Sequence, residues 1–301
     1  MSFTTIVKNE VSKIELNQTE KISELAAIMH YSRDLKVTTE NSSVARRIFK
    51  TIKDIYGVNA IITVRKGYNY HKNYIYILDI KQKEELIRKD LNLNSNVPHT
   101  YMIDDESLLR AYLRGLFLIC GSINDPKTSR YHLEFVVDDI DYANFICDKL
   151  NTYGLNSKAI KRDLKYMIYI KEAEKIGDFL RLINATSAVL YYEDIRIYRD
   201  HKNMTNRLNN CEQANVDKII QTGLNQVHDI EKIIEEGGLD LLDEKTRIIA
   251  EYRLKYPEAS LQELSEIIGI ETPTKLTKSG VYHRMKKITE LAGRIKENEE
   301  S

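Results

Sequence analysis

The residues best suited to chemistry lie near the end of the chain, between Lys275 and Lys296. Seven basic side chains fall there against a single acid, Glu290, so the segment carries a net charge of +6. The rest of the chain therefore sums to −6, because the total is zero. Like charges crowded on a helix destabilise it slightly, which favours a phosphate-bearing partner such as a nucleic acid. A solvated basic helix without a partner is the simpler alternative.

Three short helices are expected to position this segment. The stretch "LDEKTRIIAEYRLKYP" predicts a helix that stops at Pro257, and Ser260 with Glu263 forms a capping box that starts the next one. After the break "ETPTK", the third helix presents an apolar stripe at helical spacing: Val281, Met285, Ile288 and Leu291. Three helices with a turn before the third are typical of a helix-turn-helix.

In a helix-turn-helix, the N-terminal part of the second helix of the pair enters the major groove of DNA. The residues expected nearest the bases are Thr277, Lys278, Ser279, Tyr282 and His283. Those expected toward the flanks and the DNA backbone are Arg284, Lys286 and Lys287. The role of Arg284 stays open, because arginine also pairs bidentately with guanine. Double-stranded DNA is therefore the expected partner.

Composition argues against several other kinds of site. The chain has 301 residues, 42% hydrophobic and 30% charged, which is enough for two or three globular domains. Cys120, Cys147 and Cys211 are far apart and form no CxxC pair, so neither a zinc site nor a disulfide framework is indicated. No run approaches the roughly 18 apolar residues of a membrane span, and the N-terminus lacks a signal-peptide core. We expect a cytoplasmic, nucleoid-associated protein without a cofactor or a membrane partner.

The first two thirds of the chain contain an internal repeat. The segment "ELAAIMHYS" precedes "YLRGLFLIC" by 88 positions, which aligns Ala27 with Gly115 and Ser32 with Cys120. Each is followed by segments whose patterns predict strand, helix, strand, strand and helix. Two copies of one α/β unit are therefore expected, related by a pseudo-two-fold axis.

The small residues of these helices suggest how the copies meet. If the helices near 20–32 and 107–121 pack side by side, their backbones approach closely only where side chains are small. Ala27 and Gly115 would provide that gap, since glycine has no Cβ. The alternative is a buried helix that contains an incidental glycine.

The segment "YLRGLFLICGS" resembles the LAGLIDADG motif of homing endonucleases, and "LAAIMHYSR" resembles a weaker copy. The resemblance implies an α+β fold of two αββαββα units, with the motif helices at their interface and a saddle of strands over DNA. It also implies an acid at the end of each motif helix, which binds the metal for phosphodiester cleavage. Ser32 and Cys120 occupy these positions, and neither is the hard anionic ligand that Mg²⁺ prefers.

We therefore interpret the pair as a degenerate motif with no catalytic residue and no metal ligand. The acids or amides nearby, Asp34, Asn124 and Asp125, lie past the aligned positions. Cys120 is expected to act as a small buried hydrophobe. The saddle offers a second candidate DNA surface, formed by Lys158, Lys161, Arg162 and Lys165.

The connector after the repeats contains the Asn-rich stretch "TNRLNNCEQAN". Asparagine favours turns and caps, so we expect a structured linker that leads into a helix closed by "EEGG". A second interpretation is open here, in which four basic residues contact phosphates: Arg196, Arg199, Lys202 and Arg207.

The combination of the motif pair with "PEASLQELSEIIG" and "LTKSGVYHRMKKI" resembles the bacterial WhiA family, from about Lys21 to Ile295. The resemblance implies a DNA-binding transcriptional regulator, tied to sporulation and cell division, that lacks endonuclease activity. It leaves another transcription factor or RNA polymerase open as a protein partner. Two alternatives remain: a working LAGLIDADG endonuclease or maturase, and a ligand- or protein-binding module with a helix-turn-helix as DNA anchor.

The expected domain organisation follows from these segments. It comprises repeat 1 (1–95), repeat 2 (96–195), a linker and helix (196–240), an all-α helix-turn-helix domain (241–296) and a disordered tail (297–301).

Overall fold

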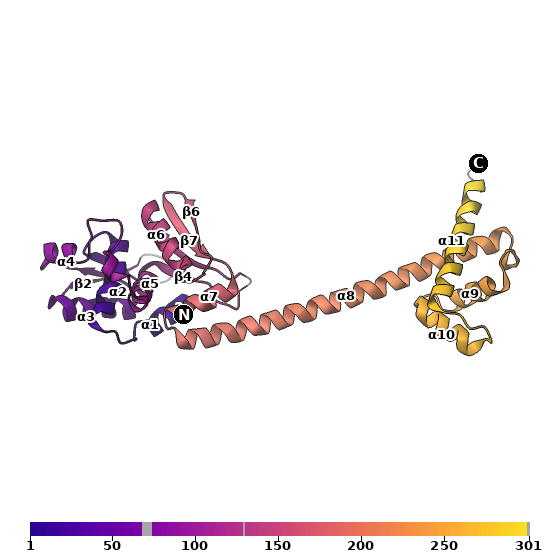
Figure 1. The fold of residues 1–301 in the computed structure, drawn as a ribbon, viewed down its shortest axis with the longest axis horizontal. Coiled ribbons are helices and arrows are strands. Elements are labelled where there is room, and N and C mark those ends of the chain that lie inside the picture. Colours follow the sequence, from indigo (N-terminus) through magenta and orange to yellow (C-terminus); the bar gives the residue numbers. More distant parts are fainter. Residues whose placement is uncertain (68–73, 129, 300–301) are drawn as a thin grey trace. The chain divides into compact units, whose positions relative to one another are not determined.

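The computed structural model describes residues 1–67, 74–128 and 130–299, and the chain divides into two compact units (Figure 1). Unit 1 is Met1–Asp200 and unit 2 is His201–Ser301. The elements up to the shared helix are α1 (Phe3–Val11), α2 (Gln18–Ser32), β1 (Lys36–Thr39), α3 (Ser42–Tyr56), β2 (Ile61–Lys66), β3 (Tyr74–Asp79), α4 (Glu84–Asp90), η1 (Thr100–Met102), α5 (Glu106–Cys120), β4 (Gly121–Ile123), β5 (Leu133–Val137), α6 (Ile140–Asn151), β6 (Lys158–Arg162), β7 (Lys165–Ile170) and α7 (Ala173–Leu182). Helix α8 (Thr186–Glu236) begins in unit 1 and continues into unit 2. The remaining elements are η2 (Leu239–Leu241), α9 (Glu244–Lys255), α10 (Leu261–Glu271) and α11 (Lys278–Glu299).

Unit 1 contains the two predicted copies of one α/β unit. The first copy runs α2, β1, α3, β2, β3, α4, in the predicted order. The second copy has one strand more, β4, and so completes the αββαββα pattern. The strand orders are β1-β3-β2 and β4-β5-β7-β6, with every pairing antiparallel. Sequence reasoning missed β4 because its three residues follow α5 directly, too few for an alternating pattern.

The motif helices α2 and α5 pack against each other at the centre of the unit 1 core. α2 begins with a capping box between Asn17 and Glu20, and Asp105 caps α5. A Cβ placed on Gly115 would overlap the backbone carbonyl oxygen of Glu24, so only glycine permits this approach. Ala27 is fully buried in the same core. The close helix contact predicted from Gly115 is therefore confirmed, with Glu24 as its direct neighbour.

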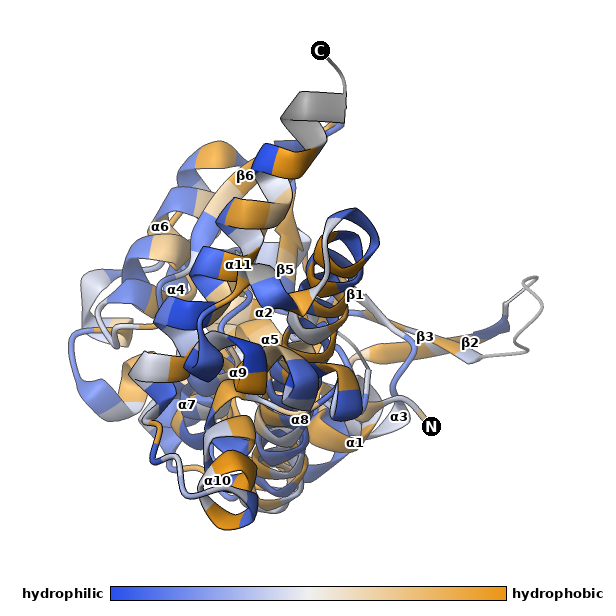
Figure 2. Cartoon of the chain, turned by 90° about the vertical axis from the view of Figure 1, so that its right-hand side faces the viewer, coloured by the Kyte–Doolittle hydropathy of each residue, from blue (hydrophilic) through white to orange (hydrophobic). Residues whose placement is uncertain are grey.

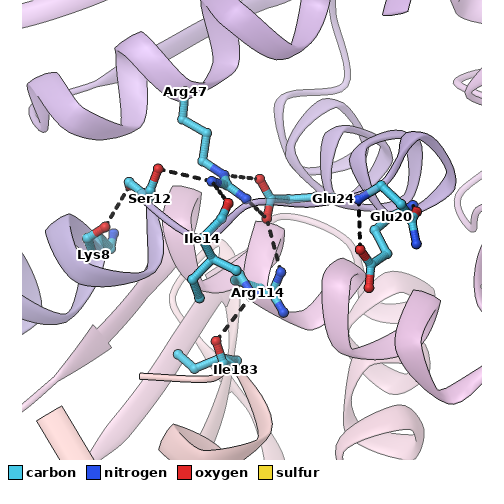
Figure 3. A network of polar contacts seen from close by, with 9 residues as sticks. Lys8, Ser12, Ile14, Glu20, Glu24, Arg47, Arg114 and Ile183 are labelled. Atoms are coloured by element: carbon cyan, nitrogen blue, oxygen red, sulfur yellow. Dashed lines mark hydrogen bonds and ion pairs between the residues drawn. The ribbon is translucent and has the colours of Figure 1, made fainter. Parts of the chain in front are cut away.

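A buried carboxylate reinforces this contact (Figure 3). Glu24, only 2% exposed, accepts hydrogen bonds from the Nε and Nη2 atoms of Arg47 on α3. Arg114, also 2% exposed, lies on α5 with its Nη1 3.7 Å from the same carboxylate. The Arg114 Nε donates to the carbonyl of Ile183, at 3.2 Å. The carboxylate of Glu24 thus connects both motif helices and α3, and Arg114 extends the network to Ile183 after α7.

Helix α1 was not predicted, although Phe3, Val7 and Val11 form an apolar stripe at helical spacing. The hydroxyl of Thr4 donates to the Ile123 carbonyl (2.8 Å) and accepts from the Ile123 amide (2.9 Å). α1 thereby covers the free edge of β4. The carboxylate of Glu10 also accepts hydrogen bonds from the first two amides of α8 beyond Thr186, a favourable place for a negative charge.

The Asn-rich connector is helical throughout, which corrects the prediction of a linker before a helix. α8 is a single helix of 51 residues that starts before residue 196 and includes the whole stretch 205–215. No Gly or Pro occurs between Thr186 and Gly223, and Asn costs at most about 0.7 kcal/mol relative to Ala in a helix. The predicted glycine stop is confirmed: the amides of Gly237 and Gly238 both donate to the carbonyl of Ile233.

In unit 2, α9, α10 and α11 confirm the three predicted helices. α9 ends before Pro257, and the Ser260–Glu263 capping box starts α10. Val281, Met285 and Ile288 are buried as predicted, whereas Leu291 is half-buried and Ala292 is buried instead. α11 continues to Glu299, so the expected tail is helical through 299, and residues 300–301 lie outside the described residues.

Two further features complete the fold. The β2–β3 hairpin extends away from the rest of unit 1 (Figure 2). Among the described residues, no helix is both long enough and apolar enough to cross a membrane.

We predict that Gly115→Ala destabilises unit 1 by about 1–3 kcal/mol, because the new Cβ would overlap the Glu24 carbonyl. Chemical denaturation of the full chain measures this change. Gly269→Ala on α10 is the control, since a Cβ there meets no atom within 4 Å; it should stabilise its helix by about 0.5–1 kcal/mol. An unchanged midpoint for Gly115→Ala would contradict the proposed packing.

His30 on α2 gives unit 1 a pH dependence. The ring is 5% exposed, and its Nε2 donates to the Leu91 carbonyl at 2.9 Å. Burial lowers the pKa of His30 from its ordinary value of 6.5, so the folded state favours the neutral ring. The stability that the folded protein gains by burying the neutral ring is fully present above pH 6.5. It is lost as the pH falls through 6.5 toward the lowered pKa, because only the unfolded chain takes up the proton there.

We therefore expect the unfolding midpoint to drop between pH 7.5 and pH 5.5, and to drop less in His30→Gln. The exposed His201 provides the control, and His201→Gln should retain the wild-type dependence. Identical pH profiles for wild type and His30→Gln would exclude His30 as the cause.

Candidate nucleic-acid interface

The exposed face of α11 carries most of the residues predicted to contact DNA. Ser279, Tyr282, His283, Lys286 and Lys287 are all exposed, and spacings of three and four residues connect them into one stripe. The opposite face holds the apolar residues of the unit 2 core. The helix therefore presents hydroxyl, aromatic, imidazole and ammonium groups together, which suits contact with bases and phosphates.

Several hydrogen bonds fix the turn before α11. The hydroxyl of Ser265 on α10 donates to the Leu276 carbonyl at 2.7 Å. Thr277 accepts from the Gly280 amide at 3.2 Å and so caps the start of α11. Thr272 donates to the Ile268 carbonyl at 2.8 Å. The long turn is thus attached to α10 at both ends, and it holds the exposed Thr277 and Lys278 at the N-terminus of α11.

Arg284 differs from its predicted neighbours, because it is partly buried at the side of α11. Hydrogen bonds from Thr246 lower the pKa of Asp243, and the charges of Arg284 and Lys287 lower it further. The guanidinium of Arg284 therefore lies toward the N-terminus of α9, where Asp243 is the cap. Lys286 pairs with Glu290 at 3.7 Å on the exposed face. Of the three residues predicted to contact the DNA backbone, Arg284 is partly buried and Lys286 is paired. Lys287 is therefore the most accessible of the three.

The saddle residues predicted in unit 1 lie on the β6–β7 hairpin. Lys158, Arg162 and Lys165 are exposed and share one face of the sheet, since Lys158 pairs with Tyr169 and Arg162 with Lys165. Lys161 alternates to the other face. Lys165 is paired with Asp138 at 3.3 Å. The structure thus brings three of the four together.

The ends of the motif helices contain no outward-facing ligand. The hydroxyl of Ser32 donates to the Ile28 carbonyl at 3.1 Å, and the thiol of Cys120 donates to the Leu116 carbonyl at 3.3 Å. Burial raises the pKa of Cys120 to about 12, so the thiol is neutral at physiological pH. Each side chain is thus directed back to its own helix.

Lys8 of α1 lies beside Cys120, and sequence reasoning missed it. Its ammonium lies 5.7 Å from the centre of the Phe117 ring, and burial lowers its pKa to about 8. An ammonium here, with a hydroxyl and a neutral thiol, does not fit the carboxylate set that a hard divalent cation requires. Within residues 1–67, 74–128 and 130–299, no three His, Cys, Asp or Glu side chains cluster as metal ligands would.

The basic residues of the connector differ in their surroundings. Arg196 is bound to Glu193 at 2.6 Å, and Arg199 donates to the Pro126 carbonyl at 2.7 Å. Lys202 and Arg207 are exposed on α8. Only the last two are therefore positioned for phosphate contact.

Profiles of known families match three parts of the chain. The WhiA N-terminal LAGLIDADG-like domain matches residues 18–94, the WhiA LAGLIDADG-like domain matches 109–202, and the WhiA C-terminal HTH domain matches 205–292. Two LAGLIDADG-like repeats and a helix-turn-helix define the class of the protein.

Whole-chain relatives agree with these profiles. A protein of Enterococcus faecalis described as "Probable cell division protein WhiA" is 41% identical over 312 residues, covering 99% of both chains. One of Bacillus cytotoxicus with the same description is 38% identical over 315 residues, covering 99% of this chain and 98% of its own. The crystal structure of full-length DUF199/WhiA from Thermatoga maritima has a TM-score of 0.57 at 26% identity, and covers 98% of this chain and 99% of that one. The chain belongs to the WhiA family.

We predict different effects for two exposed residues of α11. His283→Ala should reduce the preference for specific over random DNA by roughly 1–3 kcal/mol, as expected for a base contact. Lys287→Ala should weaken both complexes alike and lower the slope of log K against log salt by about one, as expected for a phosphate contact. Salt titrations on specific and random duplexes distinguish the two. If neither variant alters binding to either DNA, α11 is not the recognition element.

Proposed function

We propose that this chain is a sequence-specific DNA-binding transcriptional regulator of the WhiA type, acting in the control of cell division and of sporulation. The observation that carries the proposal is the exposed stripe of α11, which combines base-reading and phosphate-binding groups at a helix fixed by its turn to α10. The names of the relatives, which call them probable cell division proteins, support the process. A cytoplasmic, nucleoid-associated location follows from such a role, with another transcription factor or RNA polymerase as a candidate partner.

Genome-wide immunoprecipitation of bound DNA tests this proposal. The expected result is a set of discrete sites near promoters that share a motif. A uniform distribution over the chromosome would contradict sequence-specific regulation.

We further propose that the LAGLIDADG-like unit lacks endonuclease activity. The hydroxyl of Ser32 and the thiol of Cys120 stand where the resemblance places metal-binding acids, and the ammonium of Lys8 lies beside them. Two-metal cleavage needs anionic oxygen ligands that clamp the attacking and leaving oxygens, and the described residues contain no cluster of three or more side chains that could hold a metal.

Supercoiled DNA incubated with the protein and Mg²⁺ or Mn²⁺ should therefore remain supercoiled. The measurement is agarose electrophoresis over time, with an active nuclease as positive control. Nicking that disappears in Cys120→Ala would overturn the proposal.

A ligand-binding role for unit 1 is the second candidate. It is favoured by a cleft of about 1090 Å³ between α1 and the end of β1, lined by the side chains of Lys8, Thr5, Thr38 and Asn41 among others. In this case the helix-turn-helix would be the DNA anchor and the repeats would bind the effector. Binding of DNA that depends on a small molecule, and loses this dependence in Lys8→Met, would favour it.

A further inference from the structure

Unit 2 contains a second cavity, of about 570 Å³, next to the start of α11. Its walls come from α8, from Arg253 on α9, from the loop between α9 and α10 with the first turn of α10, and from the first residue of α11. The lining residues are Asn215, Lys218, Ile219, Thr222, Gly223, Arg253, Ala259, Ser260, Leu261, Gln262 and Lys278. Three of them are basic and none is acidic.

Arg253 is the unusual member of this set. It is 1% exposed, yet it forms no ion pair with a described acid. Its Nη1 donates to three carbonyls, those of Tyr256 (3.2 Å), Pro257 (3.3 Å) and Ala259 (2.6 Å). Its Nε has no acceptor among the described residues. Burying a charge without a counter-charge is costly, so this guanidinium lacks the anion that ordinarily accompanies it.

Gly223 explains why α8 is part of the site. A Cβ at this position would overlap the carbonyl oxygen of Pro257 and would lie 3.3 Å from the Nη1 of Arg253. The absence of a side chain therefore lets α8 lie directly on the α9–α10 loop. This contact places Lys218, five residues earlier on α8, at the cavity.

The remaining groups add positive potential. Lys218 and Lys278 are exposed and make no ion pair among the described residues. The N-terminus of α10 contributes the partial positive charge of its first amides. The acid of this turn, Glu263, is engaged, since its carboxylate accepts from the Ser260 amide at 2.7 Å.

We propose that this cavity is a phosphate site, in which Arg253, Lys218, Lys278 and the N-terminus of α10 bind one phosphate group. The phosphate is either a phosphodiester of the DNA backbone beside α11 or a free phosphate anion. In the first case the proposal rests on the proposed function, and it gives α8 a direct part in DNA binding. It also assigns Lys278 to the phosphate side of the interface instead of the base edges.

Lys218→Gln in the full chain is the central variant, because the side chain is exposed and its loss leaves the core intact. Lys232→Gln is the matched control: it removes the same charge from the same helix outside the cavity. Lys218→Arg retains the charge. Arg253 itself is unsuitable, since its carbonyl contacts hold the loop.

The DNA arm measures affinity for a random-sequence duplex as a function of salt. If the phosphate is that of DNA, Lys218→Gln should lower the slope of log K against log salt by about one, and Lys218→Arg should restore it. Lys232→Gln should leave the slope unchanged. An equal loss in both glutamine variants would overturn the site, because it would show a general effect of charge on α8.

The second arm measures inorganic phosphate binding by calorimetry without DNA, at constant ionic strength. Saturable binding at one site per chain that is lost in Lys218→Gln, with DNA binding unaltered, would identify a free phosphate as the ligand. If Lys218→Gln matches Lys232→Gln in both arms, the site is wrong even though the protein binds DNA. If the wild type binds no DNA, the proposed function fails, and the calorimetric arm alone decides the phosphate site.

Discussion

The packing of α2 on α5 is the contact on which unit 1 depends. At the crossing, the backbone of Glu24 occupies the space that a side chain at residue 115 would fill. The side chain of the same glutamate accepts from Arg47 and faces Arg114, so the close contact and the buried ion pairs form one arrangement. Removing one partner of a buried pair typically costs about 3–5 kcal/mol, since the other charge is left uncompensated. Backbone proximity and charge pairing therefore fix the two repeats together.

The same crossing determines what the motif helices present at their ends. Because α2 and α5 are fixed along their length, Ser32 and Cys120 are brought to one side of the unit whatever their chemistry. Each then donates to a carbonyl one turn earlier in its own helix, a pattern open to short hydroxyl and thiol side chains. α1 adds Lys8 next to Cys120. The fold thus fixes the ends of the motif helices independently of the side chains at residues 32 and 120.

Much of this could be predicted from the sequence, and the failures have physical causes. Gly115 predicted the helix contact, because an apolar helix requires glycine only where another backbone approaches it closely. The Ser260–Glu263 capping box predicted the start of α10, because the geometry of a capping box is local. The linker predicted for the Asn-rich segment was wrong because Asn only weakly disfavours a helix. The 37 consecutive positions 186–222 contain no Gly or Pro to interrupt one. β4 was too short for a periodic signal. The buried Arg253 and its cavity depend on residues from four helices, α8 to α11, which no local pattern brings together.

Two glycines that permit close backbone approach show that the packing of this chain does not depend on the residues at its motif-helix ends. Gly115 and Gly223 each face a carbonyl oxygen of another segment, so either position would be destabilised by almost any side chain. By contrast, a carboxylate at residue 32 or 120 would be required only by a metal, and its replacement by Ser or Cys leaves the helix contact intact. Packing constraints therefore hold the LAGLIDADG-like geometry whether or not residues 32 and 120 are acids. The groups that suit a nucleic acid lie instead on α11 and around Arg253, where the cavity lining contains three basic residues and no acid.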